Sequence, residues 1–236
     1  MNLPVDAALR SVSLDDKYDA TDGKVYLTGT QALVRLPLMQ RQRDLAAGLN
    51  TAGYISGYRG SPVGGFDQAL WKARRQLAEH HVRFVPGLNE DLAATAIWGT
   101  QQLNSFPDAN YDGVFSIWYG KGPGVDRAGD ALRHANQAGS SAHGGVLAVA
   151  GDDHGAKSST MAAQVDFIFQ AVSIPVLAPA TVQDYIDLGL HGFALSRFSG
   201  LWAGIKAVTD TIEAAGIVDV SQQRVRPVLP QGLNMP

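Results

Sequence analysis

The chain has 236 residues, of which 45% are hydrophobic, and its formal net charge at pH 7 is −3. This length and composition allow a large buried core, in one large domain or two small ones. The weakly acidic balance and the lack of a long Lys/Arg run argue against a nucleic-acid-binding surface. No stretch of 18 apolar residues occurs and the first 16 residues lack a signal-peptide pattern, so we expect a cytoplasmic protein that does not enter a membrane.

The chain contains no cysteine. It can therefore form no disulfide, and it offers no thiolate nucleophile and no ligand for a cysteine-bound iron–sulfur cluster. Any iron–sulfur cluster that works with this chain must lie on another segment.

In chain order, a polar and aperiodic arm (1–22) precedes a helical pattern that starts near Thr30 and runs towards Gly48, with Pro37 starting or kinking it. Five short apolar runs follow, at 54–58, 82–85, 114–119, 146–150 and 174–177. Helical patterns come after them, at 66–80, 89–103, 125–138, 158–171 and 182–197. Strands that alternate with helices of this length predict the α/β class, as a doubly wound, mostly parallel sheet with helices on both faces.

The last part of the chain is less regular. Residues 201–215 read as helical, and periodicity does not decide whether they continue the preceding helix or start a new one. Residues 218–236 include VRPVLPQGLNMP, whose three prolines are typical of a linker, and we expect this linker to be cut within a longer polypeptide. The expected organisation is an arm (1–22), one domain (23–217) and this linker.

The stretch GYRGSPVGG (57–65) is predicted to connect the first strand to the next helix. In an open α/β sheet, ligands are usually held at such strand-to-helix turns. Glycine lets a backbone approach a ligand closely, but any tight turn also needs it. The nine residues alone leave both explanations open, a plain turn and a ligand-binding turn.

The stretch PGLNEDLAATAIWG (86–99) places Asn89 at a helix N-cap and Glu90 and Asp91 in the first turn. Acids at this position interact favourably with the helix dipole by about 0.3–1 kcal/mol, which is a purely structural explanation. The small apolar residues that follow, however, suit a buried or interface helix. A carboxylate at the edge of such a dry site can carry out proton chemistry.

Two further loops carry candidate ligands. WYGKGPGVDRAGD (118–130) could bind phosphate through backbone N–H groups, but it fits neither the dinucleotide fingerprint nor the Walker pattern. In AGDDHGAKSS (150–159), Asp152, Asp153 and His154 are possible metal ligands, but consecutive residues rarely converge on one ion. We therefore expect a capped loop with Ser158 starting a helix, and we assign no metal ligand.

Taken together, six stretches resemble the N-terminal part of the long, fused indolepyruvate ferredoxin oxidoreductases. They are SLDDKY (13–18), GTQALVRLPLMQRQRDLAAGLNTAG (29–53), GYRGSPVGG, PGLNEDLAA, WYGKGPGVDRAGD and GGVLAVAGDDHGAKSS. This family belongs to the thiamine diphosphate-dependent 2-oxoacid:ferredoxin oxidoreductases. The resemblance covers about residues 12–236, and it implies that residues 23–217 form the pyrimidine-binding (Pyr) domain.

The resemblance also implies roles for particular residues. Glu90 matches the catalytic glutamate that bonds N1′ of the cofactor's aminopyrimidine and so prepares its 4′-nitrogen to take up a proton. Ser61 stands where shorter relatives have the threonine of a Tyr-Pro-x-Thr-Pro turn, and it is expected to bind substrate. From its charge and position we add Arg59 as a partner of the substrate carboxylate. Further cofactor contacts are expected from the adjoining loops, at Gly60, Pro62, Lys121 and Gly122.

Half of the family's site is missing from this sequence. Its Gly-Asp-Gly motif with a downstream Asn, which holds Mg²⁺ and the diphosphate, has no good counterpart here. The expected partners are therefore the remaining domains of the same enzyme, a second copy in a homodimer of the full-length form, ferredoxin, coenzyme A and a 2-oxoacid. The expected reaction is oxidative decarboxylation to an acyl-CoA. The alternative is a free-standing Pyr-like module, or a nucleotide-binding α/β domain that uses residues 120–124 without catalysis.

Overall fold

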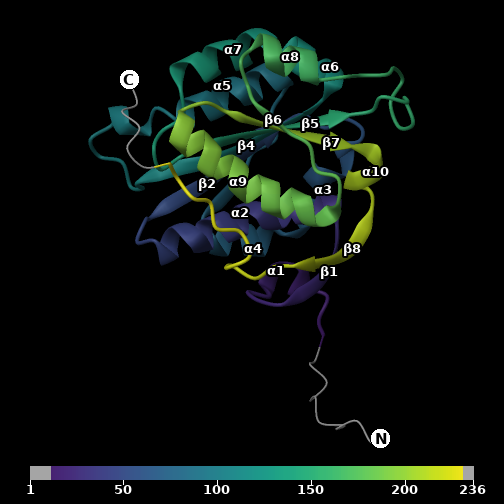
Figure 1. Cartoon of the computed structure of the whole chain (residues 1–236). Coiled ribbons are helices and arrows are strands. Elements are labelled where there is room, and N and C mark those ends of the chain that lie inside the picture. The colour runs from purple at the N-terminus through teal and green to yellow at the C-terminus, as the bar shows by residue number, and fades with distance from the viewer. Residues whose placement is uncertain (1–11, 231–236) are drawn as a thin grey trace, which may run out of the picture.

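The computed structural model describes residues 12–230, and its centre is a six-stranded parallel sheet (Figure 1). The strand order is β3-β2-β4-β5-β7-β6, and every pair of neighbours is parallel. The strands are β2 (Thr51–Gly57), β3 (Val82–Phe84), β4 (Gly113–Lys121), β5 (Val146–Asp152), β6 (Val176–Leu177) and β7 (Ala203–Val208). The predicted doubly wound α/β fold is confirmed.

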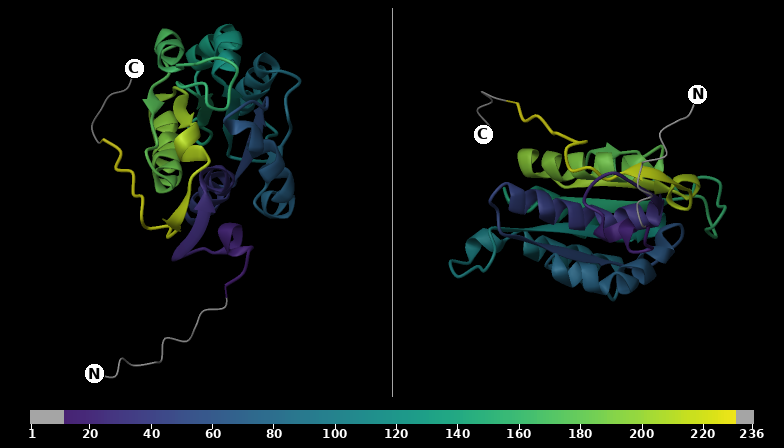
Figure 2. Two further views of the ribbon diagram at one scale, coloured as in Figure 1. Left: turned by 90° about the vertical axis from the view of Figure 1, so that its right-hand side faces the viewer. Right: turned by 90° about the horizontal axis from the view of Figure 1, so that it is seen from below.

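Helices cover both faces of this sheet, as Figures 1 and 2 show. One apolar cluster joins one face to α2 (Gly29–Ala46), α3 (Phe66–Lys72), α4 (Arg74–Glu79) and α9 (Val182–Ser199). A second cluster joins the other face to α5 (Glu90–Thr100), α6 (Gly122–Arg127), α7 (Gly129–Ala138) and α8 (Asp166–Ala171). In β5, Leu147 and Val149 belong to the first cluster, whereas Val146, Ala148 and Ala150 belong to the second. This two-sided burial explains why the strand is a continuous apolar run.

The prediction for residues 201–215 was wrong. They contain β7, a short helix α10 (Thr209–Ile212) and the start of β8 (Ala215–Asp219). Helix α9 ends at Ser199 because Gly200 adopts a left-handed conformation (φ 75°) that terminates the helix. Strand β7 then inserts between β5 and β6, where Ala203, Ile205 and Ala207 are fully buried.

Both ends of the described chain fold against the domain. Strand β1 (Lys24–Thr28) pairs antiparallel with β8, and in Figures 1 and 2 these purple and yellow strands lie side by side outside the main sheet. The expected linker start at residue 218 therefore falls inside β8, and Val218 and Val220 are fully buried. The sequence missed this pair because β1 and β8 are far apart along the chain. Residues 1–11 and 231–236 of the expected arm and linker lie outside the described residues.

The arm contains α1 (Asp16–Asp19), which is tied to the domain by a buried arginine. Arg35, in α2, donates hydrogen bonds to the carbonyl oxygens of Lys17 and Ala20. Its side chain is almost completely buried, and this burial lowers its pKa to about 10. The part of the arm next to the domain is thus packed against it.

Several helix boundaries differ from those expected. Helix α2 begins at Gly29, one residue before Thr30, because Thr28 caps it in a reciprocal capping box with Gln31, and Pro37 lies inside the helix. The patterns at 66–80 and 125–138 each divide into two helices, α3 with α4 and α6 with α7. Helix α8 begins only at Asp166, so Ser158 does not start a helix.

Helices α2 and α9 are connected by a mostly buried ion pair. Arg197 donates two hydrogen bonds to Asp44, with Nη1–Oδ1 and Nη2–Oδ2 distances of 2.6 and 2.8 Å. Gln40 and Thr51 also donate to the Asp44 carboxylate, whose side chain is only 4% exposed. The same arginine donates to the carbonyl oxygen of Gly144, so one cluster joins two helices and the loop before β5.

Among residues 12–230, no helix combines the length and the apolar character that crossing a membrane would require.

Candidate functional site

Residues from three of the candidate stretches lie at one edge of the sheet. Strands β2, β4 and β5 are parallel, with Gly57 opposite Tyr119 and Lys121 opposite Gly151. Arg59 and Ser61 follow the end of β2, Lys121 ends β4 and Asp152 ends β5. All four therefore lie at the carboxyl ends of adjacent parallel strands, which is the edge where open α/β sheets bind ligands.

The glycines of GYRGSPVGG do not share one role. A Cβ atom at position 57 would clash with the carbonyl oxygen of Tyr119, which shows that the backbones of β2 and β4 approach each other closely there. At position 60 it would lie 2.7 Å from Cδ of Lys121, which shows how tightly the turn packs on the end of β4. At positions 64 and 65, a Cβ atom would meet nothing within 4 Å. Packing therefore requires glycine in the first half of the turn, near Arg59, and not in the second half.

We expect Gly57→Ala to destabilise the domain, because the added methyl group meets rigid backbone in a fully packed strand. Overpacking of this kind typically costs about 1–3 kcal/mol. The matched control is Gly64→Ala, which adds the same methyl group in open space and should leave the melting temperature nearly unchanged. Equal melting temperatures for the two variants, measured by thermal denaturation, would contradict the close approach at position 57.

Glu90 is the first residue of α5, and its side chain is 11% exposed. As predicted, Asn89 caps this helix: its Oδ1 accepts a hydrogen bond of 2.8 Å from the Leu92 N–H. The Glu90 carbonyl oxygen accepts a hydrogen bond of 3.0 Å from Nε1 of the buried Trp118 in β4. The cap and the tryptophan hold the start of α5 against the end of the central strand.

The glycines at the junction of β4 and α6 leave space for the Glu90 carboxylate. A Cβ atom at Gly124 would lie 2.5 Å from Oε1 of Glu90, and one at Gly120 would lie 3.4 Å from its Cγ. The spacing of these glycines suggested a phosphate-binding loop, but the structure shows that they make room for a carboxylate. Sequence reasoning missed this contact because about 30 residues separate its two sides.

The Glu90 carboxylate has little interaction with other side chains. Its nearest cation is Arg127, whose Nε lies 3.9 Å from Oε2 of Glu90 but 3.2 Å from Oδ2 of Asp91. Within residues 12–230, no group donates a hydrogen bond to this carboxylate. A mostly buried carboxylate without a donor can accept a hydrogen bond from a bound ligand.

The loop after β5 contains two aspartates with different environments. Asp153 accepts hydrogen bonds from the backbone N–H groups of Lys157 and Ser158, and the Ser158 contact is the main cause of its lowered pKa. It therefore caps the loop. Asp152 is fully buried, and its burial raises its pKa. The loop also reaches the first turn, where the Ser159 hydroxyl donates to the Ser61 carbonyl oxygen at 3.3 Å.

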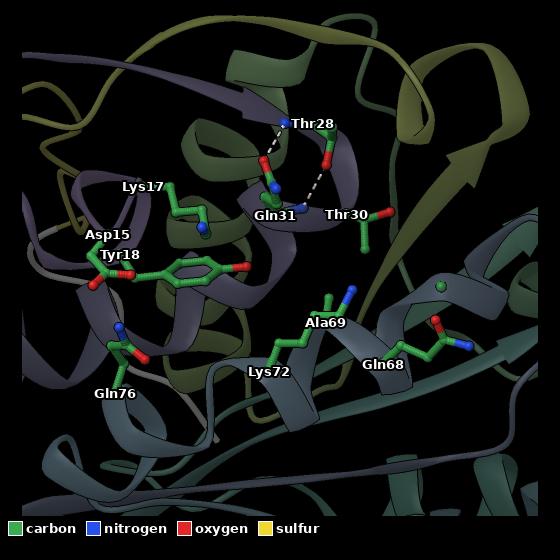
Figure 3. A pocket seen from close by; sticks show the side chains of 11 residues that line it. Asp15, Lys17, Tyr18, Thr28, Thr30, Gln31, Gln68, Ala69, Lys72 and Gln76 are labelled. Carbon is green, nitrogen blue, oxygen red and sulfur yellow. Dashed lines mark hydrogen bonds between the residues drawn. The ribbon is translucent and has the colours of Figure 1, made fainter. Parts of the chain in front are cut away.

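A separate pocket of about 390 Å³ lies between α1, the start of α2 and α3 (Figure 3). Its lining includes Lys17 and Lys72, and it shares Gly65 with the GYRGSPVGG turn. Thr28 and Gln31 also line it, but their side chains bond each other's backbone in the capping box. None of the residues predicted to bind substrate or cofactor lines this pocket.

Comparison with models of protein families finds no match for this chain. The curated proteins provide no match either. Among solved structures, the chain is similar to the 2-oxoglutarate:ferredoxin oxidoreductase from Magnetococcus marinus with 2-oxoglutarate, coenzyme A and succinyl-CoA bound, with a TM-score of 0.58 and 15% sequence identity. The similarity covers 82% of this chain and 31% of that chain, so the present chain spans about a third of that enzyme's length.

At this level of identity, the similarity establishes the fold. The six-stranded parallel sheet with helices on both faces is the fold that this chain shares with part of that enzyme. The edge that carries Glu90 and Arg59 is the ligand-binding edge of such a sheet.

Proposed function

We propose that this chain is the Pyr domain of a thiamine diphosphate-dependent 2-oxoacid:ferredoxin oxidoreductase. The enzyme would decarboxylate a 2-oxoacid oxidatively to an acyl-CoA and pass the electrons to ferredoxin. The observation that carries this proposal is the Glu90 carboxylate, which is mostly buried and has no hydrogen-bond donor among the described residues. The fold shared with a 2-oxoglutarate:ferredoxin oxidoreductase supports the same reaction class.

The residues at the sheet edge fit one half of the cofactor. When bound, thiamine diphosphate supplies the electron sink that decarboxylation of a 2-oxoacid requires. Glu90 would accept a hydrogen bond from N1′ of its aminopyrimidine, and would thereby control the protonation of that ring. Gly60, Pro62, Lys121 and Gly122 would surround the pyrimidine. Gly60 and Pro62 lie in the turn after β2, and Lys121 and Gly122 lie where β4 meets α6.

The substrate would bind at the turn after β2. Arg59 would pair with the carboxylate of the 2-oxoacid, for which a guanidinium group offers two parallel hydrogen bonds. Ser61 would donate a hydrogen bond from its hydroxyl group to the same substrate. Within this reaction class we favour indolepyruvate or another aryl pyruvate, on the basis of the sequence resemblance.

The other half of the enzyme would come from outside this chain. A second domain would hold Mg²⁺ and the diphosphate, and a cysteine-containing segment would hold the iron–sulfur clusters, because this chain has no cysteine. We further propose that the full-length form is a cytoplasmic homodimer. A nucleotide-binding role for residues 120–124 gains no support, since Gly120 and Gly124 pack against Glu90 and α6 has only six residues.

We expect the isolated chain to bind thiamine diphosphate weakly or not at all, because the diphosphate and Mg²⁺ would contact the missing domain. Calorimetric titration with Mg²⁺ present should therefore show no binding in the low micromolar range. Adding the missing domain should restore binding. A low micromolar dissociation constant for this chain alone would contradict the division of the site between two domains.

The proposed function itself is tested with the enzyme assembled from this chain and its partner domains. We expect reduction of ferredoxin that depends on a 2-oxoacid, coenzyme A and thiamine diphosphate. Comparing indolepyruvate, pyruvate and 2-oxoglutarate by kcat/KM would identify the substrate class. Absence of turnover with all three, in an enzyme that has bound the cofactor, would contradict the proposal.

A further inference from the structure

Three side chains that could bind a metal ion converge beside the ends of β5 and β7. Asp152 ends β5, His154 follows it in the loop, and Asp166 starts α8. Each offers one ligand atom, and the three atoms lie within 4.8 Å of one another. From the sequence, Asp152, Asp153 and His154 were considered together and no metal ligand was assigned. Asp153 instead caps the loop, and Asp166 comes from 12 residues beyond His154.

The environment of Asp152 is the second, independent observation. Its side chain is fully buried, yet its Oδ1 has no hydrogen-bond partner within the described part of the chain. Its Oδ2 receives one long hydrogen bond, 3.3 Å from the Val165 N–H, and lies 3.1 Å from Nε2 of His154. A buried ionised carboxylate with so few partners is unfavourable unless a cation compensates its charge.

Among residues 12–230, one lysine bonds to this cluster, and it does not bond to Asp152. Lys206, in β7, donates to both oxygens of Asp166, at 3.0 and 3.1 Å. Carboxylates that bind metals are commonly held by such outer hydrogen bonds. Asp166 could therefore bind an ion through one oxygen and keep Lys206 on the other. With the imidazole neutral, the two carboxylates and one lysine leave the cluster with one uncompensated negative charge.

From this arrangement we propose that Asp152, His154 and Asp166 form a binding site for a divalent transition-metal ion such as Zn²⁺. Imidazole and carboxylate ligands suit first-row metals. Metal–ligand distances of roughly 2.0–2.2 Å place ligand atoms at most about 4.4 Å apart, so the cluster needs to contract only slightly. The side chains of His154 and Asp166 are 48% and 37% exposed, which leaves coordination positions open to water or to a small anionic ligand.

The proposed metal site is distinct from the proposed cofactor site at Glu90, although both lie at the same edge of the sheet. The loop that contains His154 contacts the first turn through Ser159 and Ser61, and Ala163 packs against Gly122. Metal binding would therefore order the loop that borders the proposed substrate turn. The proposal does not depend on the oxidoreductase activity and can be tested without it.

The test is a titration of this chain with Zn²⁺, in competition with a chromophoric chelator. We expect one high-affinity Zn²⁺ per chain, and at 100 times the dissociation constant a rise in melting temperature of roughly 5–10 °C. Asp166→Asn and His154→Gln should each weaken binding by at least about 10–100-fold, the loss usually seen when even an outer partner of a ligand is removed. Asp152→Asn should do the same.

An exposed His–Asp pair without a buried carboxylate serves as the matched control. His134 lies 3.6 Å from Asp130 in α7, and the two side chains are 59% and 91% exposed. His134→Gln should bind Zn²⁺ like the parent. Unchanged affinity in both Asp166→Asn and His154→Gln, or no stoichiometric binding by the parent, would overturn the proposal. Should Asp152→Asn fail to fold, the Zn²⁺ affinities of Asp166→Asn and His154→Gln still decide the test.

Discussion

In the assembled enzyme, Glu90→Gln should lower 2-oxoacid-dependent ferredoxin reduction by about 10²–10⁴-fold, the usual loss when a positioned acid–base group is removed. The amide keeps the size of the side chain, so it should still fit beside Gly120 and Gly124. It cannot, however, act as an anion towards N1′ of the aminopyrimidine. Melting temperature should change little, because an acid in the first turn of a helix stabilises it by only about 0.3–1 kcal/mol.

Asp91→Asn is the matched control for this experiment. Asp91 is the next residue of α5, but its side chain is 38% exposed and pairs with Arg127. Turnover of this variant should stay within a few-fold of the parent, as for other surface substitutions. Loss of turnover in Asp91→Asn with full activity in Glu90→Gln would show that the other carboxylate carries the function. Full activity of both would contradict the role of this helix start.

Asp44→Ala should destabilise the domain by about 3–5 kcal/mol, because it leaves the partly buried Arg197 without its counter-ion. The substitution also removes the acceptor of hydrogen bonds from Gln40 and Thr51. For a domain of this size, the loss corresponds to a fall in melting temperature of roughly 6–20 °C. Thermal denaturation measured by circular dichroism would show it.

The control for this prediction is Arg75→Ala, which breaks an exposed pair. Arg75 bonds Asp19 and Glu79, but its side chain is 55% exposed, and solvent screens such interactions. We expect its removal to affect stability much less than Asp44→Ala does. Similar melting temperatures for the two variants would mean that the Asp44–Arg197 pair adds nothing beyond an ordinary surface contact.

Patterns within short segments were sufficient to predict much of the fold. The apolar run at 146–150 predicted β5 because a strand buried on both faces has no polar side. Asn89 predicted the start of α5 because its side chain caps the helix within three residues. Once the parallel strands are assigned, Arg59, Ser61, Lys121 and Asp152 must share an edge, because parallel strands end on the same side of a sheet.

Only the tertiary structure revealed the features that depend on distant segments. Strand β7 has few residues typical of strands by themselves, and it becomes a strand because β5 and β6 offer hydrogen bonds on both sides. The pairing of β1 with β8 joins the two ends of the described chain. Likewise, the space for Glu90 beside Gly124, and the convergence of Asp166 on Asp152 and His154, arise from contacts between separate elements. Local sequence determines propensity and burial pattern, whereas such contacts depend on how the whole chain packs.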